Sequence, residues 1–362
     1  MYEADLSLLC CPHSKGALSI ETVTTRGDGG EILEGVLRAG ERRYPIRRGI
    51  PRFVDDVSHN PTWDYKWRVL DGGRGLNYRI LDRTDPAYSI HDIYDRNDHG
   101  GDAFNHMHGR LALDLGCGVG QYAVKSLTEK HAAKVVAIDL TGGVDVFRTI
   151  VETRYPELLP RLLIVQGDIL ALPLRDASFD YVYSLGVLMH TGRTLEALSR
   201  ACGLVKDGGE INVWLYGSEP LAYDAIEPGR ESVLNLFSAG AFLHRQLWPM
   251  RFIHWFRRIP HDRAVAIVKV FSSDFMYRLA RRGGFRWLGR LFPTVDHPDR
   301  AYRLINNYDG YINNWCDTWS EHEVFPVLRR HSIAVLGIGT WRLGVWGRKL
   351  PGFYAPAGKA QP

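Results

Sequence analysis

The sequence predicts an α/β protein whose central parallel sheet spans residues 106–220 and 304–350. Short apolar runs lie between residues 110 and 217, and they read RLALDLG, KVVAIDL, RLLIVQGD, FDYVYSLG and GGEINVWLYG. Helical stretches such as YAVKSLTEKH and RTLEALSRACGLV alternate with them. Strands that are apolar throughout are buried on both faces, and strand–helix alternation is typical of a parallel sheet. With 362 residues and 45% hydrophobic content, the chain is long enough for more than one domain.

The other segments follow in order along the chain. Residues 1–58 include LEGVLRAGERRYPIRRGIPRFV, whose alternation and Gly/Pro breaks predict a small β-rich domain. Residues 59–105 form an aromatic-rich connector with short helices, and residues 221–303 form a mostly helical insertion. SEHEVFPVLRRH predicts a helix with Ser320 as its N-cap, and SIAVLGIG and WRLGVWGRK predict an antiparallel pair of strands at one edge of the sheet.

Composition narrows the class of protein. The formal net charge is +4 with 24% charged residues, which is only a weak indication of anionic partners. The five cysteines are odd in number, with two adjacent and the rest scattered, so they do not make a disulfide framework, and this favours a reducing compartment. The first residues do not resemble a signal peptide, and no run approaches the roughly 18 apolar residues of a membrane span. We therefore expect a cytoplasmic protein; the sequence leaves its oligomeric state open.

The glycine-rich stretch LALDLGCGVGQYA follows the first apolar run. A dinucleotide loop has the pattern G-x-G-x-x-G, which brings the backbone close to a pyrophosphate at a helix N-terminus. Here the pattern is Gly116-x-Gly118-x-Gly120, and Asp114 precedes it. A carboxylate at this point disfavours a diphosphate and favours a cationic ligand without phosphate. S-adenosylmethionine is such a ligand, and its carboxylate can take the amides of the helix N-terminus.

Two further acids end the next two apolar runs. Asp139 follows about 20 residues after the glycines, where a carboxylate can accept both ribose hydroxyls. Asp168 ends the third run, where it and the following amide can recognise the adenine edge. Each acid alone is more often a helix cap or a surface residue. Three acids at three successive strand ends form a specific pattern.

On these motifs, together with QGDILALPLRDASFDYVYSLGVLMHT and LVKDGGEINVWLYG, the chain resembles the class I S-adenosylmethionine-dependent methyltransferases. The resemblance is to methyltransferase type 11, the ubiquinone/menaquinone-biosynthesis-like group. It implies a Rossmann-like sheet of seven strands with a reversed hairpin at the edge, and a cofactor at the carboxyl ends of the strands. The cofactor-binding residues expected from the pattern and the resemblance are Asp114, Gly116, Cys117, Gly118, Gly120, Asp139, Leu140, Asp168, Ile169 and Ser184.

Methyl transfer needs in-line positioning, and a base only for a poor nucleophile. His190 in SLGVLMHT is the candidate base, because imidazole accepts protons near neutral pH; a structural role is an equal alternative. Relatives commonly carry Leu-His-His-Thr there, and Met189 replaces the first histidine. Asp309 is a second polar candidate. The candidate pocket residues come from two aromatic clusters, for which ordinary packing is the alternative: Trp63, Trp67, Tyr308, Tyr311 and Trp315.

Two segments raise the question of metal. His99, His106 and His108, with Asp98 and Asp102, have short spacings, but no matching downstream pair follows, so we expect no metal site there. LLCCPHSKGAL followed by YPIRRGIP resembles a small zinc-ribbon protein that activates methyltransferases. Cys11 remains, whereas Ser14, Ala39 and Arg42 stand near the places of the other three ligands. We therefore expect a zinc-ribbon-like domain without zinc.

The insertion is strongly basic, with 13 Lys and Arg against 4 Asp between residues 241 and 303. It fits a helical lid over the acceptor, a surface for RNA or anionic lipid, or a solvated face or oligomer contact. The lid or plain packing is favoured, since no RNA-binding signature is present. The sequence thus predicts a methyltransferase acting on a small-molecule intermediate. The alternatives are an RNA (tRNA) methyltransferase and a non-catalytic, cofactor-binding partner subunit.

Overall fold

The computed structural model describes residues 1–54, 61–71, 98–99, 103–217, 258–281, 297–312, 317–339 and 343–353. Most of the predicted connector, residues 221–257 and 282–296 of the predicted insertion, and Trp315 lie outside the described residues. Within the described part, no helix is long and apolar enough to cross a membrane.

The central sheet has the predicted strands in the order β11-β12-β9-β8-β5-β6-β7, and a short strand, β10, pairs with β9. Its parallel strands are β5 (Leu111–Leu115), β6 (Lys134–Asp139), β7 (Leu162–Gln166), β8 (Phe179–Leu185) and β9 (Val205–Gly217). The closing strands β11 (Ile333–Ile338) and β12 (Leu343–Lys349) are antiparallel, as predicted, and β12 pairs antiparallel with β9. The sequence order therefore reverses between β5 and β8, which is where open α/β sheets place ligands.

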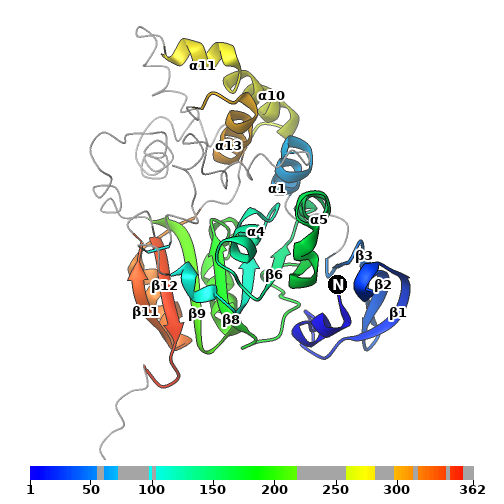
Figure 1. The fold of residues 1–362 in the computed structure, drawn as a ribbon. Coiled ribbons are helices and arrows are strands. Elements are labelled where there is room, and N and C mark those ends of the chain that lie inside the picture. Colours follow the sequence, from blue (N-terminus) through cyan, green and yellow to red (C-terminus); the bar gives the residue numbers. More distant parts are fainter. Residues whose placement is uncertain are drawn as a thin grey trace, which may run out of the picture.

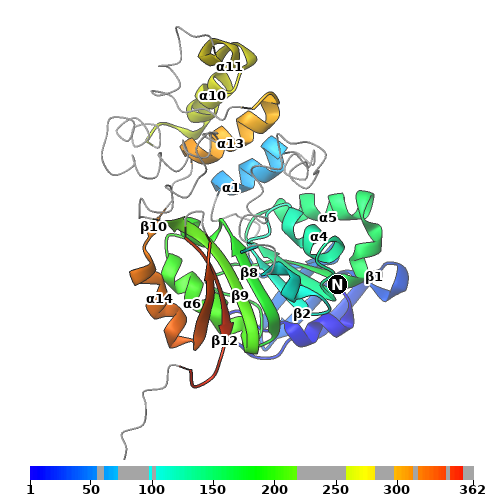
Figure 2. The ribbon, with the colours of Figure 1, turned by 60° about the vertical axis from the view of Figure 1, so that its left-hand side comes forward.

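Helices cover both faces of this sheet (Figure 2). On one face lie α4 (Gln121–Thr128) and α5 (Gly143–Arg154), and on the other lie α6 (Thr194–Leu204) and α14 (Glu321–Arg330). The predicted N-cap of α14 is confirmed: Ser320 forms a capping box with Glu323, which satisfies amides that the first helical turn leaves free.

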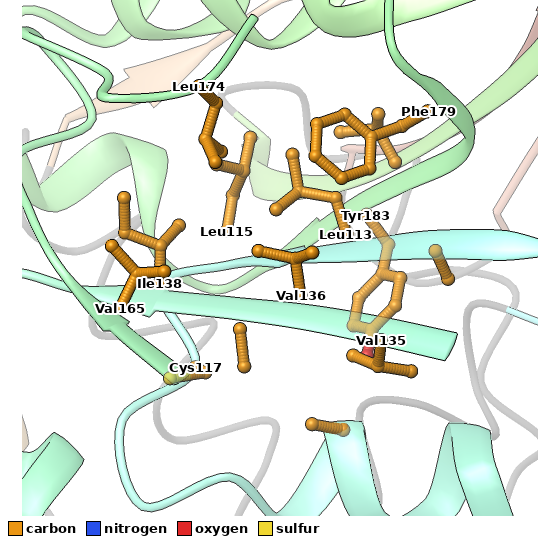
Figure 3. Close-up of a cluster of buried hydrophobic side chains, with 14 of the residues drawn as sticks. Leu113, Leu115, Cys117, Val135, Val136, Ile138, Val165, Leu174, Phe179 and Tyr183 are labelled. Carbon is orange, nitrogen blue, oxygen red and sulfur yellow. The ribbon is translucent and has the colours of Figure 1, made fainter. Parts of the chain in front are cut away.

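The core lies between the sheet and these helices, and the unalternating apolar runs supply it. Figure 3 shows side chains of β5, β6 and β7 packed together, among them Leu113, Leu115, Val136, Ile138 and Val165. All five strand residues are buried. At about 25 cal/mol per Å² of apolar surface, this burial is the main force that orders the sheet and its carboxyl edge.

The N-terminal residues form a separate antiparallel sheet in the order β1-β2-β3-β4. Its strands are β1 (Ser19–Arg26), β2 (Ile32–Ala39), β3 (Arg42–Arg47) and β4 (Ile50–Pro51), and a 3-10 helix, Glu3–Leu8, precedes them. Figure 1 shows this sheet beside α5. It joins the core directly, because the Phe53 amide donates to the Gln166 carbonyl at the end of β7, and the Arg148 guanidinium pairs with Glu31.

A layer of helices lies above the carboxyl edge of the central sheet (Figures 1 and 2). It contains α1 (Pro61–Tyr65), which continues as a π-helix (Lys66–Asp71), and three helices from later in the chain: α10 (His261–Phe271), α11 (Asp274–Arg281) and α13 (Arg300–Ile312). A second hydrophobic cluster joins the π-helix, α10 and α13, and it is formed by Leu70, Ala264, Val265, Val268, Ile305, Tyr308, Tyr311 and Ile312. We call α1 and the π-helix the cap.

Candidate functional site

The glycine loop between β5 and α4 turns through left-handed backbone at all three predicted glycines. The φ angles of Gly116, Gly118 and Gly120 are 84°, 55° and 81°. A Cβ on Gly116 would lie 2.3 Å from Val187, and one on Gly120 would lie 2.1 Å from the Phe147 ring. Two of the glycines thus admit neighbouring side chains, while Gly118 faces the cap.

Asp114 lies beneath this loop with an exposed fraction of 2%. Its Oδ2 atom has no hydrogen-bond partner among the described residues. Burial raises the pKa of Asp114 well above its ordinary value, and Asp139 raises it further, while a hydrogen bond with Tyr183 lowers it in part. A buried carboxyl with a free oxygen is stabilised in its charged form by a nearby cation. The site is therefore prepared for a positively charged group.

Asp139 ends β6 and organises the loops around it. Its Oδ2 accepts the Gly118 amide at 2.8 Å, and its Oδ1 accepts the Thr141 amide at 2.9 Å and hydroxyl at 2.7 Å. Burial raises the pKa of Asp139, and these hydrogen bonds offset part of the rise. Each carboxylate oxygen has further acceptor capacity, so the predicted ribose contact stays a prediction.

The cap lies over the glycine loop and over the residues between Asp139 and α5, a contact that the sequence only suggested. The indole of Trp67 lies against Gly118 and Gly143, since a Cβ at either glycine would be 3.0–3.1 Å from its ring atoms. The Asp64 carboxylate accepts the Gly142 amide at 2.8 Å, at the N-terminus of α5. Sequence reasoning missed Asp64, although an Asp one position after a predicted pocket tryptophan was the available signal.

His190 lies just past the carboxyl end of β8, in a 3-10 turn (Leu188–His190). Its ring is 4.9 Å from the Trp63 ring and 5.5 Å from the Tyr216 ring, measured between centroids. The turn also accepts the Asp317 amide at the Met189 carbonyl. The candidate base therefore lies among aromatic side chains on the far side of the glycine loop from Asp139, with an exposed fraction of 7%.

The other predicted polar and aromatic candidates join the cap to α13. The Lys66 ammonium lies 4.4 Å from the ring centroids of both Trp63 and Trp67 and 3.0 Å from Asp309 Oδ2. The Tyr308 hydroxyl donates to the Thr62 carbonyl at 3.0 Å. The structure thus brings Trp67 to the glycine loop and Trp63 to His190. It places Asp309 in an ion pair, and it places Tyr308 and Tyr311 in the second hydrophobic cluster.

The remaining predicted cofactor residues occupy the same edge. Asp168 Oδ1 accepts the Leu170 amide at 2.7 Å, and the Leu140 carbonyl accepts the Gln166 amide group at 3.2 Å. Ser184 is fully buried and donates to the Leu115 carbonyl, which links β8 to β5. Cys117 and Ile169 are buried beside them, and burial raises the pKa of the Cys117 thiol well above its ordinary value.

The segments considered for metal have other contacts. His106 Nδ1 lies 2.9 Å from Glu210, a buried carboxylate that also pairs with Arg348. Cys10 donates to the Leu174 carbonyl, and Cys11 lies 3.2 Å from the Tyr44 hydroxyl. Burial raises the pKa of the Cys11 thiol but hydrogen bonds, including those with Ser14 and Tyr44, outweigh it, and the pKa is lowered to about 7.

The polar side chains at the strand ends fit S-adenosylmethionine. The Oδ2 of Asp114, which no described residue contacts by a hydrogen bond, suits the cationic part of the ligand, and Asp139 and Asp168 are hydrogen-bond acceptors at the next two strand ends. The N-terminus of α4, which Gly120 caps, carries the partial positive charge that favours a carboxylate. A diphosphate would meet the buried carboxyl of Asp114 instead.

Comparison with known proteins agrees with this geometry. The model of the methyltransferase domain family matches residues 113–213. A 24-methylenesterol C-methyltransferase 2 of Oryza sativa subsp. japonica is 26% identical over 160 residues, which cover 44% of this chain and 42% of that protein. A tRNA U34 carboxymethyltransferase of Methylococcus capsulatus is 26% identical over 184 residues, which cover 50% and 46%.

A ubiquinone/menaquinone biosynthesis C-methyltransferase of Paracoccus denitrificans is 32% identical over 118 residues, which cover 31% of this chain and 45% of that protein. The chain spans less than half the length of these three relatives. The matched residues run from the middle of β5 to β9, so they contain the glycine loop and all three strand-end acids. Residues 113–213 therefore form a methyltransferase domain of the class I type, whose cofactor is S-adenosylmethionine.

Proposed function

We propose that the whole chain is an S-adenosylmethionine-dependent methyltransferase that acts on a small-molecule biosynthetic intermediate. The observation that carries the proposal is the coincidence of the matched domain with a buried Asp114 oxygen that has no partner among the described residues and lies below three left-handed glycines. The resemblance to the ubiquinone/menaquinone-biosynthesis-like group belongs to this proposal, as do the zinc-ribbon-like nature of the N-terminal domain and the domain boundaries.

The cofactor supplies a methyl group on a sulfonium, which is already an activated donor. The chain's residues then have to position and shield. Asp114 favours the cationic end of the ligand, Asp139 and Asp168 hold its nucleoside, and Trp67 excludes water from the glycine loop. His190, on the acceptor side between Trp63 and Tyr216, takes a proton at an imidazole nitrogen when the acceptor is a weak nucleophile.

The aromatic side chains around His190 support a small acceptor with apolar or planar surface. Trp63 and Tyr216 flank His190, and β10 (Thr318–Trp319) pairs with this end of β9, where Thr318 lies opposite Tyr216 and Trp319 opposite Gly217. Aromatic side chains bury large apolar area and stack on planar groups. Two of the three relatives are named as C-methyltransferases, one of a 24-methylenesterol and one of ubiquinone/menaquinone biosynthesis, which is in line with such an acceptor.

A second candidate function is RNA methylation. The similarity to a tRNA-modifying enzyme and the basic charge of residues 241–303 favour it. Binding of RNA through these Lys and Arg would weaken steeply with salt, because counterions are released on binding.

One experiment separates these functions. Purified protein is incubated with methyl-labelled S-adenosylmethionine and a fractionated cell extract, and the near-isosteric variant Asp114→Asn serves as the blank. We expect label in the small-molecule fraction with wild type and little with the variant. Label that nuclease releases would support the RNA alternative, and cofactor binding without label in any fraction would support a non-catalytic subunit.

A further inference from the structure

We propose that Arg52, a residue of the N-terminal domain, is a positioning residue for the cofactor site. It acts on residues 140–143, which follow Asp139 and end with the first residue of α5, and which we call the ribose-side loop. The inference rests on the proposed function, because it assigns the loop to the cofactor. It makes the N-terminal domain a part of the binding machinery, beyond its role as a packing unit.

Arg52 holds the far end of the ribose-side loop through Asp145. Its two terminal nitrogens donate to the Asp145 carboxylate at 2.6 and 3.2 Å, a bidentate contact. Asp145 lies in the first turn of α5, and its amide donates to the Gly142 carbonyl at 3.0 Å. The guanidinium therefore fixes the helix turn into which the loop leads.

Arg52 also holds the near end of the loop, through Gln166 of β7. Its Nη1 donates to Gln166 Oε1 at 2.8 Å, and Gln166 Nε2 donates to the Leu140 carbonyl at 3.2 Å. The orientation of the Gln166 amide is set by this pair of contacts, because only its oxygen can accept from Arg52. One guanidinium thus restrains both ends of a four-residue loop.

The environment favours arginine at this place over any other cation. The Arg52 side chain is 8% exposed, and its backbone amide is bonded to Pro45 of the N-terminal sheet. A planar guanidinium can reach two acceptors in a fixed geometry, whereas a lysine ammonium is a single point charge. A lysine could keep Asp145 but would lose the simultaneous contact with Gln166.

The restrained loop is the one that shapes Asp139. Thr141, in its middle, donates two hydrogen bonds to Asp139 Oδ1. A shift of Thr141 would move the carboxylate that faces the cofactor. Outer contacts that orient a binding side chain typically change ligand affinity by 10- to 100-fold when they are removed from a metal site.

The test measures the Kd of S-adenosylhomocysteine for the full chain by isothermal titration calorimetry. We expect the Kd to rise about tenfold in Arg52→Met, the lower end of the range for such outer contacts. Gln166→Met breaks only the branch to Leu140 and should raise the Kd in the same direction. The Kd of Arg52→Lys should lie between those of wild type and Arg52→Met, which is the partial rescue expected of a positioning charge.

The matched control is Arg48→Met. Arg48 also comes from the N-terminal domain and binds α5, through Glu152 at 2.6 Å and Thr149 at 3.2 Å, but two turns away from the ribose-side loop. The Kd of Arg48→Met should stay within about twofold of wild type, because the ion pair of Arg48 with Glu152 is exposed and remote from the loop. Thermal melting of each variant without ligand gives the temperature range in which it is folded, and every titration is carried out within that range.

The outcomes are distinct. Equal Kd values for wild type, Arg52→Met and Gln166→Met would overturn the inference, and so would an equal loss in Arg48→Met, since it would mean that domain docking in general is responsible. If wild type itself does not bind S-adenosylhomocysteine, the proposed function on which the inference rests is overturned instead.

Discussion

Replacing Gly120 by alanine should destabilise the protein through a steric effect at the glycine loop. The residue has a φ of 81°, and the new Cβ would lie 2.1 Å from Cε2 of Phe147, a side chain with no exposed surface. The left-handed conformation costs an L-residue about 1–2 kcal/mol, and overpacking of a closed core adds about 1–3 kcal/mol. We therefore expect a loss of about 2–5 kcal/mol in the free energy of unfolding.

Gly208→Ala isolates the backbone contribution. Gly208 has a similar φ of 79°, but a Cβ at this position would have no described atom within 4 Å. This variant should lose only about 1–2 kcal/mol. Urea unfolding with an unchanged m-value measures both losses. If Gly120→Ala loses no more than Gly208→Ala, the glycine is not required for the contact with Phe147, and the reasoning is refuted.

Three further predictions concern the site. S-adenosylmethionine should bind more tightly as the pH rises through the raised pKa of Asp114, because a bound cation favours the carboxylate; calorimetry should find this dependence lost in Asp114→Asn, and a flat profile in wild type would contradict it. His190→Ala should retain S-adenosylhomocysteine affinity but slow single-turnover transfer by about 10²–10⁴-fold, and an unchanged rate would assign the histidine a structural role. Lys66→Met should lower unfolding stability by about 1–2 kcal/mol, because Asp309 loses its partner; equal melting curves would mean that the pair between the cap and α13 contributes nothing.

The sheet was predictable because its signal is local. The runs around Leu113, Val136 and Ile164 are apolar without alternation, and strands buried on both faces need that composition. The carboxyl ends of such strands meet at one edge, so the three acids at their ends could be placed together from the sequence. The capping box at Ser320 was equally local.

The contacts between distant segments were not predictable in the same way. Nothing in the sequence near Arg52 indicates that its guanidinium meets Asp145 and Gln166, 93 and 114 residues away. The use of Gly116 and Gly120 to admit Val187 and Phe147 also depends on tertiary packing. Periodicity describes which face of an element is buried, but it does not identify the partner on the other side.

A comparison of two cofactors as ligands tests the central claim most directly. Wild-type protein is titrated calorimetrically with S-adenosylmethionine and, separately, with NAD, at a pH above neutrality. A buried carboxyl below the glycine loop predicts one S-adenosylmethionine bound per chain, no measurable binding of the diphosphate-containing NAD, and loss of S-adenosylmethionine binding in Asp114→Asn. Tight binding of NAD, or S-adenosylmethionine binding that is indifferent to Asp114, would contradict the account.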